Sequence, residues 1–161
     1  GKREIHFQIG GHPAFIAPGC EAGKPLKCVL RVDNKGLLQG LKSHIDGSVE
    51  MEEVELESEN GLIRFDDEFF AHDSVKLHNS QTSSVELLNP DGSVAVRHSY
   101  KCPIIAFWSP YQKNAPFVCL EPWYGVGDPR GYKGEFKDKP FINHLLPGAS
   151  FMSEYVITIG E

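Results

Sequence analysis

The chain has 161 residues, a length that suits one domain with a sizeable hydrophobic core. Hydrophobic residues make up 40% and charged residues 24%, a composition that excludes disorder as the default. The net charge is −6 and no stretch concentrates lysine or arginine, so we expect no nucleic-acid partner. No apolar run approaches the roughly 18 residues that span a bilayer, so we expect no membrane partner either.

Short strand-like segments run through nearly the whole chain, with period-two alternation or many β-branched residues. In chain order they are Glu4–Ile9, Leu26–Val32, Val49–Leu56, Leu62–Phe65, Ser74–Leu77, Ser84–Leu88, Val94–His98, Ile104–Trp108, Phe117–Glu121 and Tyr155–Ile159. Only residues 35–43, which carry three leucines, read as a short helical turn. Many short strands with regular punctuation predict an all-β, antiparallel β-sandwich that forms a single domain over residues 1–161.

Turn chemistry separates these segments. The strongest hairpin signal is Asn89-Pro90-Asp91-Gly92, because Asp-Gly tolerates the positive φ that such turns need. The first segment, Glu4–Ile9, reads as a strand that needs a neighbour to pair with. We therefore expect residues upstream in the natural protein to belong to the same fold.

The four cysteines, at positions 20, 28, 102 and 119, form no CxxC motif. Cys119 lies inside an apolar run, where a buried reduced thiol is favoured over a disulfide. Reduced cysteines fit a cytoplasmic protein, which is the localisation we expect.

The segment Ile9-Gly10-Gly11-His12-Pro13-Ala14-Phe15 places a histidine between two glycines and a proline. Glycines allow close backbone approach, and Pro13 favours an extended conformation at His12. His12 is a candidate for proton transfer, since histidine is the side chain that ordinarily titrates near neutral pH. The alternative is a histidine that forms a local hydrogen bond in a turn.

The segment Phe117–Gly125 ends an apolar strand with a glutamate and two aromatic residues. Alternation puts Cys119 and Glu121 on one face. Glu121 then lies either at a wet rim or in a desolvated place that raises its pKa and suits a general base. Trp123 follows at once and could stack on a sugar or another apolar ligand. The alternative is a strand end whose aromatic residues cover the core.

Other candidates are weaker. His72 and Asp73 stand before a strand and fit a turn, a cap or a substrate contact. Seven histidines invite a metal hypothesis, but no pair has the tight spacing typical of a zinc site, so we expect no metal. Motifs for a P-loop, a dinucleotide or a serine nucleophile are absent from the sequence.

Three segments together resemble the aldose 1-epimerase family, in its galactose mutarotase-like branch associated with lactose-utilisation genes. The segments are Gly10-Gly11-His12-Pro13-Ala14-Phe15, Ala115–Gly125, and Leu145-Leu146-Pro147-Gly148 with the strand that follows. The likeness covers nearly the whole chain, which looks like the C-terminal half of such a protein. It implies a large twisted β-sandwich with a shallow sugar pocket.

The resemblance also implies roles. His12 matches the family's general acid and Glu121 its general base, while Asp73 aligns less securely with a carboxylate that binds sugar hydroxyls. Phe15 and Trp123 would line the substrate surface. We expect His12 and Glu121 to approach one concave surface with a gap wide enough for a pyranose ring. The missing N-terminal half would complete the fold.

The function implied is interconversion of the α and β anomers of a hexose by acid–base catalysis, without cofactor or metal. Each positioned acid or base contributes about 10²–10⁴ in rate, so two of them suffice. A non-catalytic carbohydrate-binding sandwich is the main alternative, since a fold does not fix a function. A purely structural domain would leave the histidine and glutamate segments unexplained.

Overall fold

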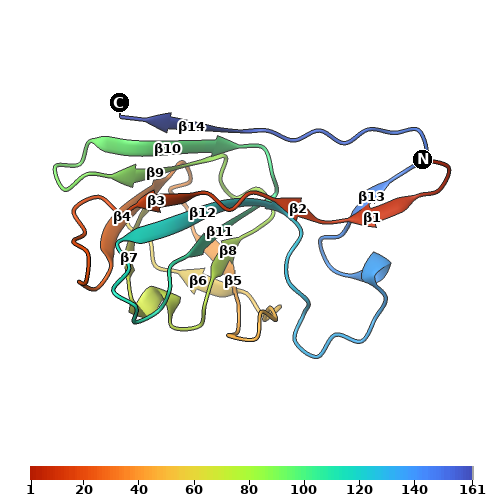
Figure 1. Ribbon diagram of the computed structural model, residues 1–161, viewed down its shortest axis with the longest axis horizontal. Coiled ribbons are helices and arrows are strands. Elements are labelled where there is room, and N and C mark those ends of the chain that lie inside the picture. The colour runs from red at the N-terminus through yellow and green to blue at the C-terminus, as the bar shows by residue number, and fades with distance from the viewer. Residues whose placement is uncertain (161) are drawn as a thin grey trace.

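The computed structural model describes residues 1–160, which form fourteen strands and two 3-10 helices (Figure 1). The strands pair antiparallel throughout the named ladders. The 3-10 helices are Glu68–Phe70 and Phe136–Asp138, and the described residues contain no helix long and apolar enough to cross a membrane. The predicted all-β, antiparallel architecture is therefore confirmed.

One sheet has five strands, in the spatial order β14-β10-β9-β4-β7. Their bounds are Tyr155–Ile159, Val94–Tyr100, Ser84–Leu88, Lys27–Val32 and Leu62–Asp66. The predicted hairpin joins β9 to β10. Gly92 has a φ of +86°, and the Asp91 carboxylate accepts hydrogen bonds from the backbone N–H and hydroxyl of Ser93 at 2.9 and 2.6 Å.

The other large sheet has seven strands, with β2-β12-β11-β8-β5-β6 in order and β3 also paired to β12. Their bounds are Ile9–Gly10, Phe117–Tyr124, Ile104–Trp108, Val75–Leu77, Leu38–Lys42, Val54–Leu56 and Ala14–Ile16. The helical turn predicted over residues 35–43 is wrong, because Leu38–Lys42 pairs with strands on both sides. Ladder hydrogen bonds on two edges outweigh the local leucine spacing.

A third, two-stranded sheet pairs β1 (Ile5–Phe7) with β13 (Asn143–Leu145) at one end of the molecule, near the N-terminus (Figure 1). The predicted strand Glu4–Ile9 is thus divided between two sheets. Of the segment Val49–Leu56, only the last three residues are a strand.

The main hydrophobic core lies between the five-stranded and seven-stranded sheets. It draws alternate residues from both, including Leu30, Phe65 and Leu87 from one and Phe107 and Leu120 from the other. A smaller apolar cluster of Leu41, Val49, Ile104 and Val126 lies on the opposite face of the seven-stranded sheet, with Trp123 and Phe141 packed against it. Both faces of this sheet are therefore partly covered.

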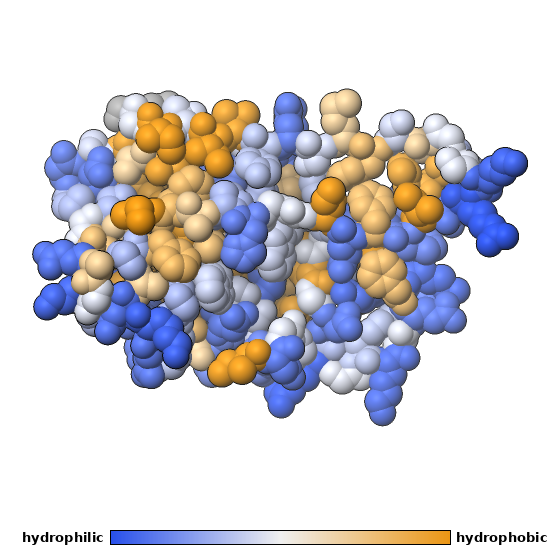
Figure 2. Space-filling view, viewed as in Figure 1, coloured by the Kyte–Doolittle hydropathy of each residue, from blue (hydrophilic) through white to orange (hydrophobic). Residues whose placement is uncertain are grey.

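The edge strand β14 leaves large apolar side chains in solvent. Tyr155, Val156, Ile157 and Ile159 are 37–67% exposed, and Figure 2 shows hydrophobic side chains gathered along the upper left of the molecule, where β14 lies in Figure 1. An apolar patch on an edge strand is typical of a surface that packs against further protein. All four cysteines are free, as the sequence predicted.

Candidate active site

Strand β12 carries Glu121 to a buried position on the outer face of the seven-stranded sheet. Val118 and Leu120 enter the main core, so the alternating residues Cys119 and Glu121 face the other way. Glu121 is only 2% exposed. One of its carboxylate oxygens, Oε2, has no hydrogen-bond partner among the described residues. Most buried polar groups are hydrogen-bonded, so the unpaired oxygen of Glu121 calls for an explanation.

His12 lies opposite Glu121 because the chain bridges from β2 to β3 along the same edge of β12. Gly11 N–H donates to Pro122 O at 3.0 Å, and Leu120 N–H donates to Pro13 O at 3.1 Å. These two bonds bracket Glu121 and bring the His12 ring over it. The His12 Nε2 atom lies 3.3 Å from Glu121 Oε1, and the imidazole is 63% exposed while the carboxylate is buried.

The close approach of β2 to β12 requires glycine. A Cβ added to Gly10 would lie 2.3 Å from Cδ1 of the Trp123 ring, a separation that no real side chain adopts. The Trp123 indole Nε1 donates to Gly11 O at 3.2 Å, which ties the ring to the strand that precedes His12. The predicted pair of glycines therefore serves backbone approach, with Trp123 as the neighbour.

A second tryptophan flanks the pair and was not singled out from the sequence. Trp108 pairs across the ladder with Cys119, which places it on the Glu121 face, and its ring is edge-on to His12 with centroids 6.1 Å apart. Its indole Nε1 donates to Asp73 Oδ1 at 2.8 Å. Asp73 thereby joins the site, one ring away from His12.

Lys76 is the other residue that sequence reasoning missed. It is 1% exposed, and its ammonium donates to the hydroxyls of Ser43 and Ser74, the latter at 2.8 Å. The Nζ atom lies 5.7 Å from the centroid of the Trp123 ring. The sequence shows a lysine between Val75 and Leu77 within a predicted strand. Only the pairing of that strand with its neighbours shows that the lysine lies on the same face of the sheet as Glu121.

The register is the reason that Lys76 and Glu121 interact. Lys76 lies opposite Ala106, and Ala106 lies opposite Glu121 on the next strand, so all three share one face. Burial raises the pKa of Glu121 to about 7, against the opposing pull of the Lys76 ammonium and with a further rise from Asp73. Burial lowers the pKa of Lys76 to about 8, opposed by Asp73 and Glu121. Both groups therefore exchange protons near neutral pH.

Two expectations need correction. Phe15 does not line this face: it pairs with Val118, and its ring packs against the main core between the sheets. Extended residues separated by an odd number point to opposite faces, and Phe15 stands three after His12. The gap of one pyranose ring between His12 and Glu121 is also absent, since the two side chains are in direct contact.

Of the other residues singled out from the sequence, Trp123 lies at the site and His72 does not. Trp123 borders the site together with His12, and both line a shallow hollow of about 370 Å³ formed by residues 8–12 and 123–127. His72 is exposed and does not line this hollow. Asp73 adopts a φ of +79°, a left-handed conformation that aspartate and asparagine tolerate better than most residues.

Three residues on the Glu121 face of the sheet could also hold a metal ion. His12, Cys119 and Glu121 each offer a ligand atom, and these atoms lie within 4.8 Å of one another. Burial, reinforced by the Glu121 charge, raises the pKa of the Cys119 thiol to about 12, whereas metal binding needs the thiolate. Metal binding at these three atoms would therefore have to release the thiol proton, whereas proton transfer between His12 and Glu121 needs no change at Cys119.

Comparisons with known proteins bear on the whole chain. No protein-family model matches it. The chain is 28% identical over 162 residues to Protein LacX of Lactococcus lactis subsp. lactis, in its plasmid and chromosomal forms, covering 98% of this chain and 54% of the relative. It thus spans about half the length of the curated relatives it matches.

Two solved structures share the fold. A galactose mutarotase related enzyme from Lactobacillus acidophilus superposes with a TM-score of 0.84 and 23% identity over 99% of this chain and 54% of that one. A galactose mutarotase-like protein from Lactobacillus casei ATCC 334 superposes with a TM-score of 0.78 and 22% identity, covering 97% and 53%. The resemblance drawn from the sequence is confirmed, including the half-length coverage.

Proposed function

We propose, because this chain is a relative of the LacX proteins and has the galactose mutarotase-like fold, that it carries the acid–base site of an aldose 1-epimerase. The observation that supports this most directly is the 3.3 Å contact between the exposed imidazole of His12 and the buried carboxylate of Glu121. One group can hold a proton and the other can accept one, on a surface bordered by two tryptophans.

The proposed reaction needs two proton transfers at neighbouring atoms. Glu121 removes the proton of the anomeric hydroxyl, and protonated His12 gives a proton to the ring oxygen, so that the C1–O5 bond breaks and an aldehyde forms. Rotation about C1–C2 and reversal of both transfers give the other anomer. Each transfer contributes about 10²–10⁴ in rate.

This chemistry explains why no ring-sized gap is required. The anomeric oxygen and the ring oxygen are bonded to the same carbon, so the acid and the base must meet two atoms that are close together. Two groups already in contact satisfy that demand once the exposed His12 ring rotates aside. The rotation is sterically open because most of the His12 side chain faces solvent.

The neighbouring residues have supporting roles in this proposal. The rings of Trp108 and Trp123 offer apolar faces for the C–H side of a hexose. Asp73 would accept hydrogen bonds from sugar hydroxyls through the carboxylate that Trp108 already orients. The Lys76 ammonium keeps part of the Glu121 population ionised at neutral pH by opposing the effect of burial.

The half that this chain does not span is part of the proposal. The exposed apolar residues of β14 form the surface against which we propose that the rest of the protein packs. Substituting Val156 and Ile159 together by serine should destabilise the longer protein while improving the solubility of this chain alone. Equal destabilisation of both forms would contradict that assignment.

Polarimetry tests the catalytic proposal. Freshly dissolved α-glucose or α-galactose should reach rotational equilibrium faster with the full-length protein that carries this chain than with buffer. The proposal fails if binding of either sugar is detected calorimetrically without any acceleration, which would instead favour a non-catalytic sugar-binding sandwich. A chelator should leave the turnover unchanged, and loss of turnover restored by zinc would support metal-assisted chemistry.

A further inference from the structure

A second cluster of ionisable side chains, separate from the His12–Glu121 pair, lies on the two-stranded sheet. His6 of β1 stands directly opposite His144 of β13 in the ladder. Residues opposite each other in antiparallel strands project to the same side. Glu4 is two residues before His6, so its side chain extends to that side too. Strand register alone therefore brings two imidazoles and one carboxylate together.

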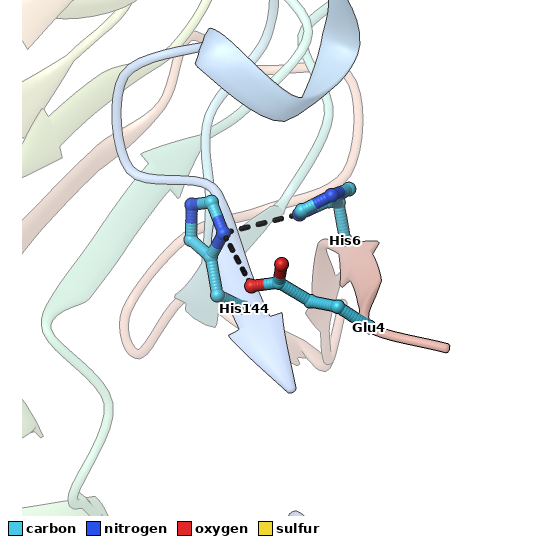
Figure 3. Close-up of side chains that lie close together, drawn as sticks. All are labelled: Glu4, His6 and His144. Atoms are coloured by element: carbon cyan, nitrogen blue, oxygen red, sulfur yellow. Dashed lines mark hydrogen bonds and ion pairs between the residues drawn. The ribbon is translucent and has the colours of Figure 1, made fainter. Parts of the chain in front are cut away.

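Figure 3 shows that the contacts converge on one atom. His144 Nδ1 lies 3.1 Å from His6 Nδ1 and 3.3 Å from Glu4 Oε1. A ring nitrogen has either one proton or one lone pair. A proton on His144 Nδ1 can be donated fully to only one of these two acceptors, and a lone pair there can accept only from His6. A single cation among the three atoms would satisfy all of them.

The spacing matches the coordination of a small divalent metal. Ligand atoms about 2.0–2.1 Å from a tetrahedral Zn²⁺ lie roughly 3.3 Å from one another. Here His144 Nδ1 lies 3.1 Å from His6 Nδ1 and 3.3 Å from Glu4 Oε1, and the three candidate ligand atoms all lie within 4.8 Å of one another. Glu4 and His144 are partly exposed, so side-chain rotation can shorten the remaining distance, between the ligand atoms of Glu4 and His6.

We propose that Glu4, His6 and His144 form a binding site for a divalent transition metal of the zinc class, with a fourth position open to water. Two imidazoles and a carboxylate are the ligand types that zinc accepts. The metal would cross-link β1 to β13. The site does not depend on the proposed sugar chemistry.

Calorimetric titration with Zn²⁺ tests the site, using protein without a histidine tag. One equivalent should bind the wild-type chain, and thermal unfolding should shift upward with added Zn²⁺. His6→Ala or His144→Ala should each weaken binding at least tenfold and abolish the thermal shift. Glu4→Gln should weaken binding less, because an amide oxygen is a poorer ligand than a carboxylate. Visible absorption with Co²⁺ should report tetrahedral coordination.

Matched controls locate the metal. His72→Ala removes an exposed histidine elsewhere, and His12→Asn removes the other possible ligand cluster; both variants should bind Zn²⁺ as the wild type does. The proposal is overturned if the wild-type chain binds no Zn²⁺. It is equally overturned if His6→Ala and His144→Ala bind with wild-type affinity, or if His12→Asn is the variant that loses the metal.

Discussion

Two glutamates on strands of this protein have opposite environments. Glu86, in the five-stranded sheet, is held by Arg31, whose Nη2 is 2.5 Å from Oε2, and by Arg97, whose Nε is 2.8 Å from Oε1. Burial pushes the Glu86 pKa upward, but hydrogen bonds from Arg97 and Arg31 bring that pKa below its usual value. Glu121, in the seven-stranded sheet, has one oxygen unpaired and a pKa raised to about 7.

The difference separates structure from chemistry. A carboxylate with both oxygens paired to arginine stays ionised and stabilises its sheet. A buried carboxylate with an unpaired oxygen destabilises the folded state but can exchange a proton at neutral pH. The comparison therefore indicates a structural role for Glu86 and supports the proton-transfer role that we propose for Glu121.

The largest expected effect is on catalysis. In the full-length protein, Glu121→Gln and His12→Asn should each lower kcat by about 10²–10⁴ with a much smaller change in KM. The loss of kcat in the double variant should be far smaller than the two single losses combined, because either proton transfer is of little use without the other. Glu86→Gln is the matched control and should keep kcat within about twofold, since it lies on the other sheet. Wild-type turnover by Glu121→Gln would make Glu121 a structural strand end.

Substituting the two glutamates by glutamine should change the stability of the protein in opposite directions. Glu121→Gln removes a carboxylate whose ionisation opposes folding, so it should raise the free energy of unfolding by about 3 kcal/mol well above pH 7, given about 1.4 kcal/mol per pKa unit. Glu86→Gln should lower the free energy of unfolding by roughly 1 kcal/mol or more. Urea unfolding of this chain measures both. Destabilisation by Glu121→Gln would show that its charge is better compensated than the contacts indicate.

The pH windows follow from the two shifts. The folded-state pKa of Glu121 is raised from 4.5 to about 7, so its contribution to stability is present at low pH and is lost as pH rises through about 7. The folded-state pKa of Glu86 is depressed, so its contribution is present at neutral pH and is lost as pH falls through that depressed value. The benefit of Glu121→Gln should accordingly vanish below about pH 4.5.

Catalysis should show the same titration, shifted by Lys76. The ratio kcat/KM should rise with pH up to about 7, because the general base must be ionised. Lys76→Met removes the ammonium that lowers the Glu121 pKa. The rise of kcat/KM should therefore shift to higher pH by about one unit. Lys42→Met, an exposed change on the neighbouring strand β5, is the control and should leave the profile in place. A profile that Lys76→Met leaves unchanged would separate Lys76 from the base.

The smallest expected effect concerns Asp73. Asparagine tolerates the φ of +79° there and can still accept the Trp108 hydrogen bond, so Asp73→Asn should preserve the backbone. Losing one charged acceptor for sugar hydroxyls should raise KM by about threefold to tenfold with kcat nearly unchanged. Steady-state kinetics decide this, and a loss confined to kcat would move Asp73 into the proton-transfer step.

Local sequence determined much of the architecture. Alternation and β-branched residues located most strands, because burying one face of a sheet demands a period of two. Asp91-Gly92 specified its hairpin through a backbone conformation that few residues adopt. The segments around His12 and Glu121 also supplied the family resemblance, since their composition is unusual and their order along the chain is kept. These features depend on neighbours in sequence alone.

Only the tertiary structure decided which residues meet. Leu38–Lys42 is a strand because two partners pair with it, and Phe15 enters the main core because its register places it opposite Val118. Lys76 reaches the Glu121 face by the same means, as His144 reaches His6. Strand register is set by the packing of whole sheets, and a shift of one residue sends every side chain to the other face. Local sequence does not determine that choice, and the proposed active surface depends on it.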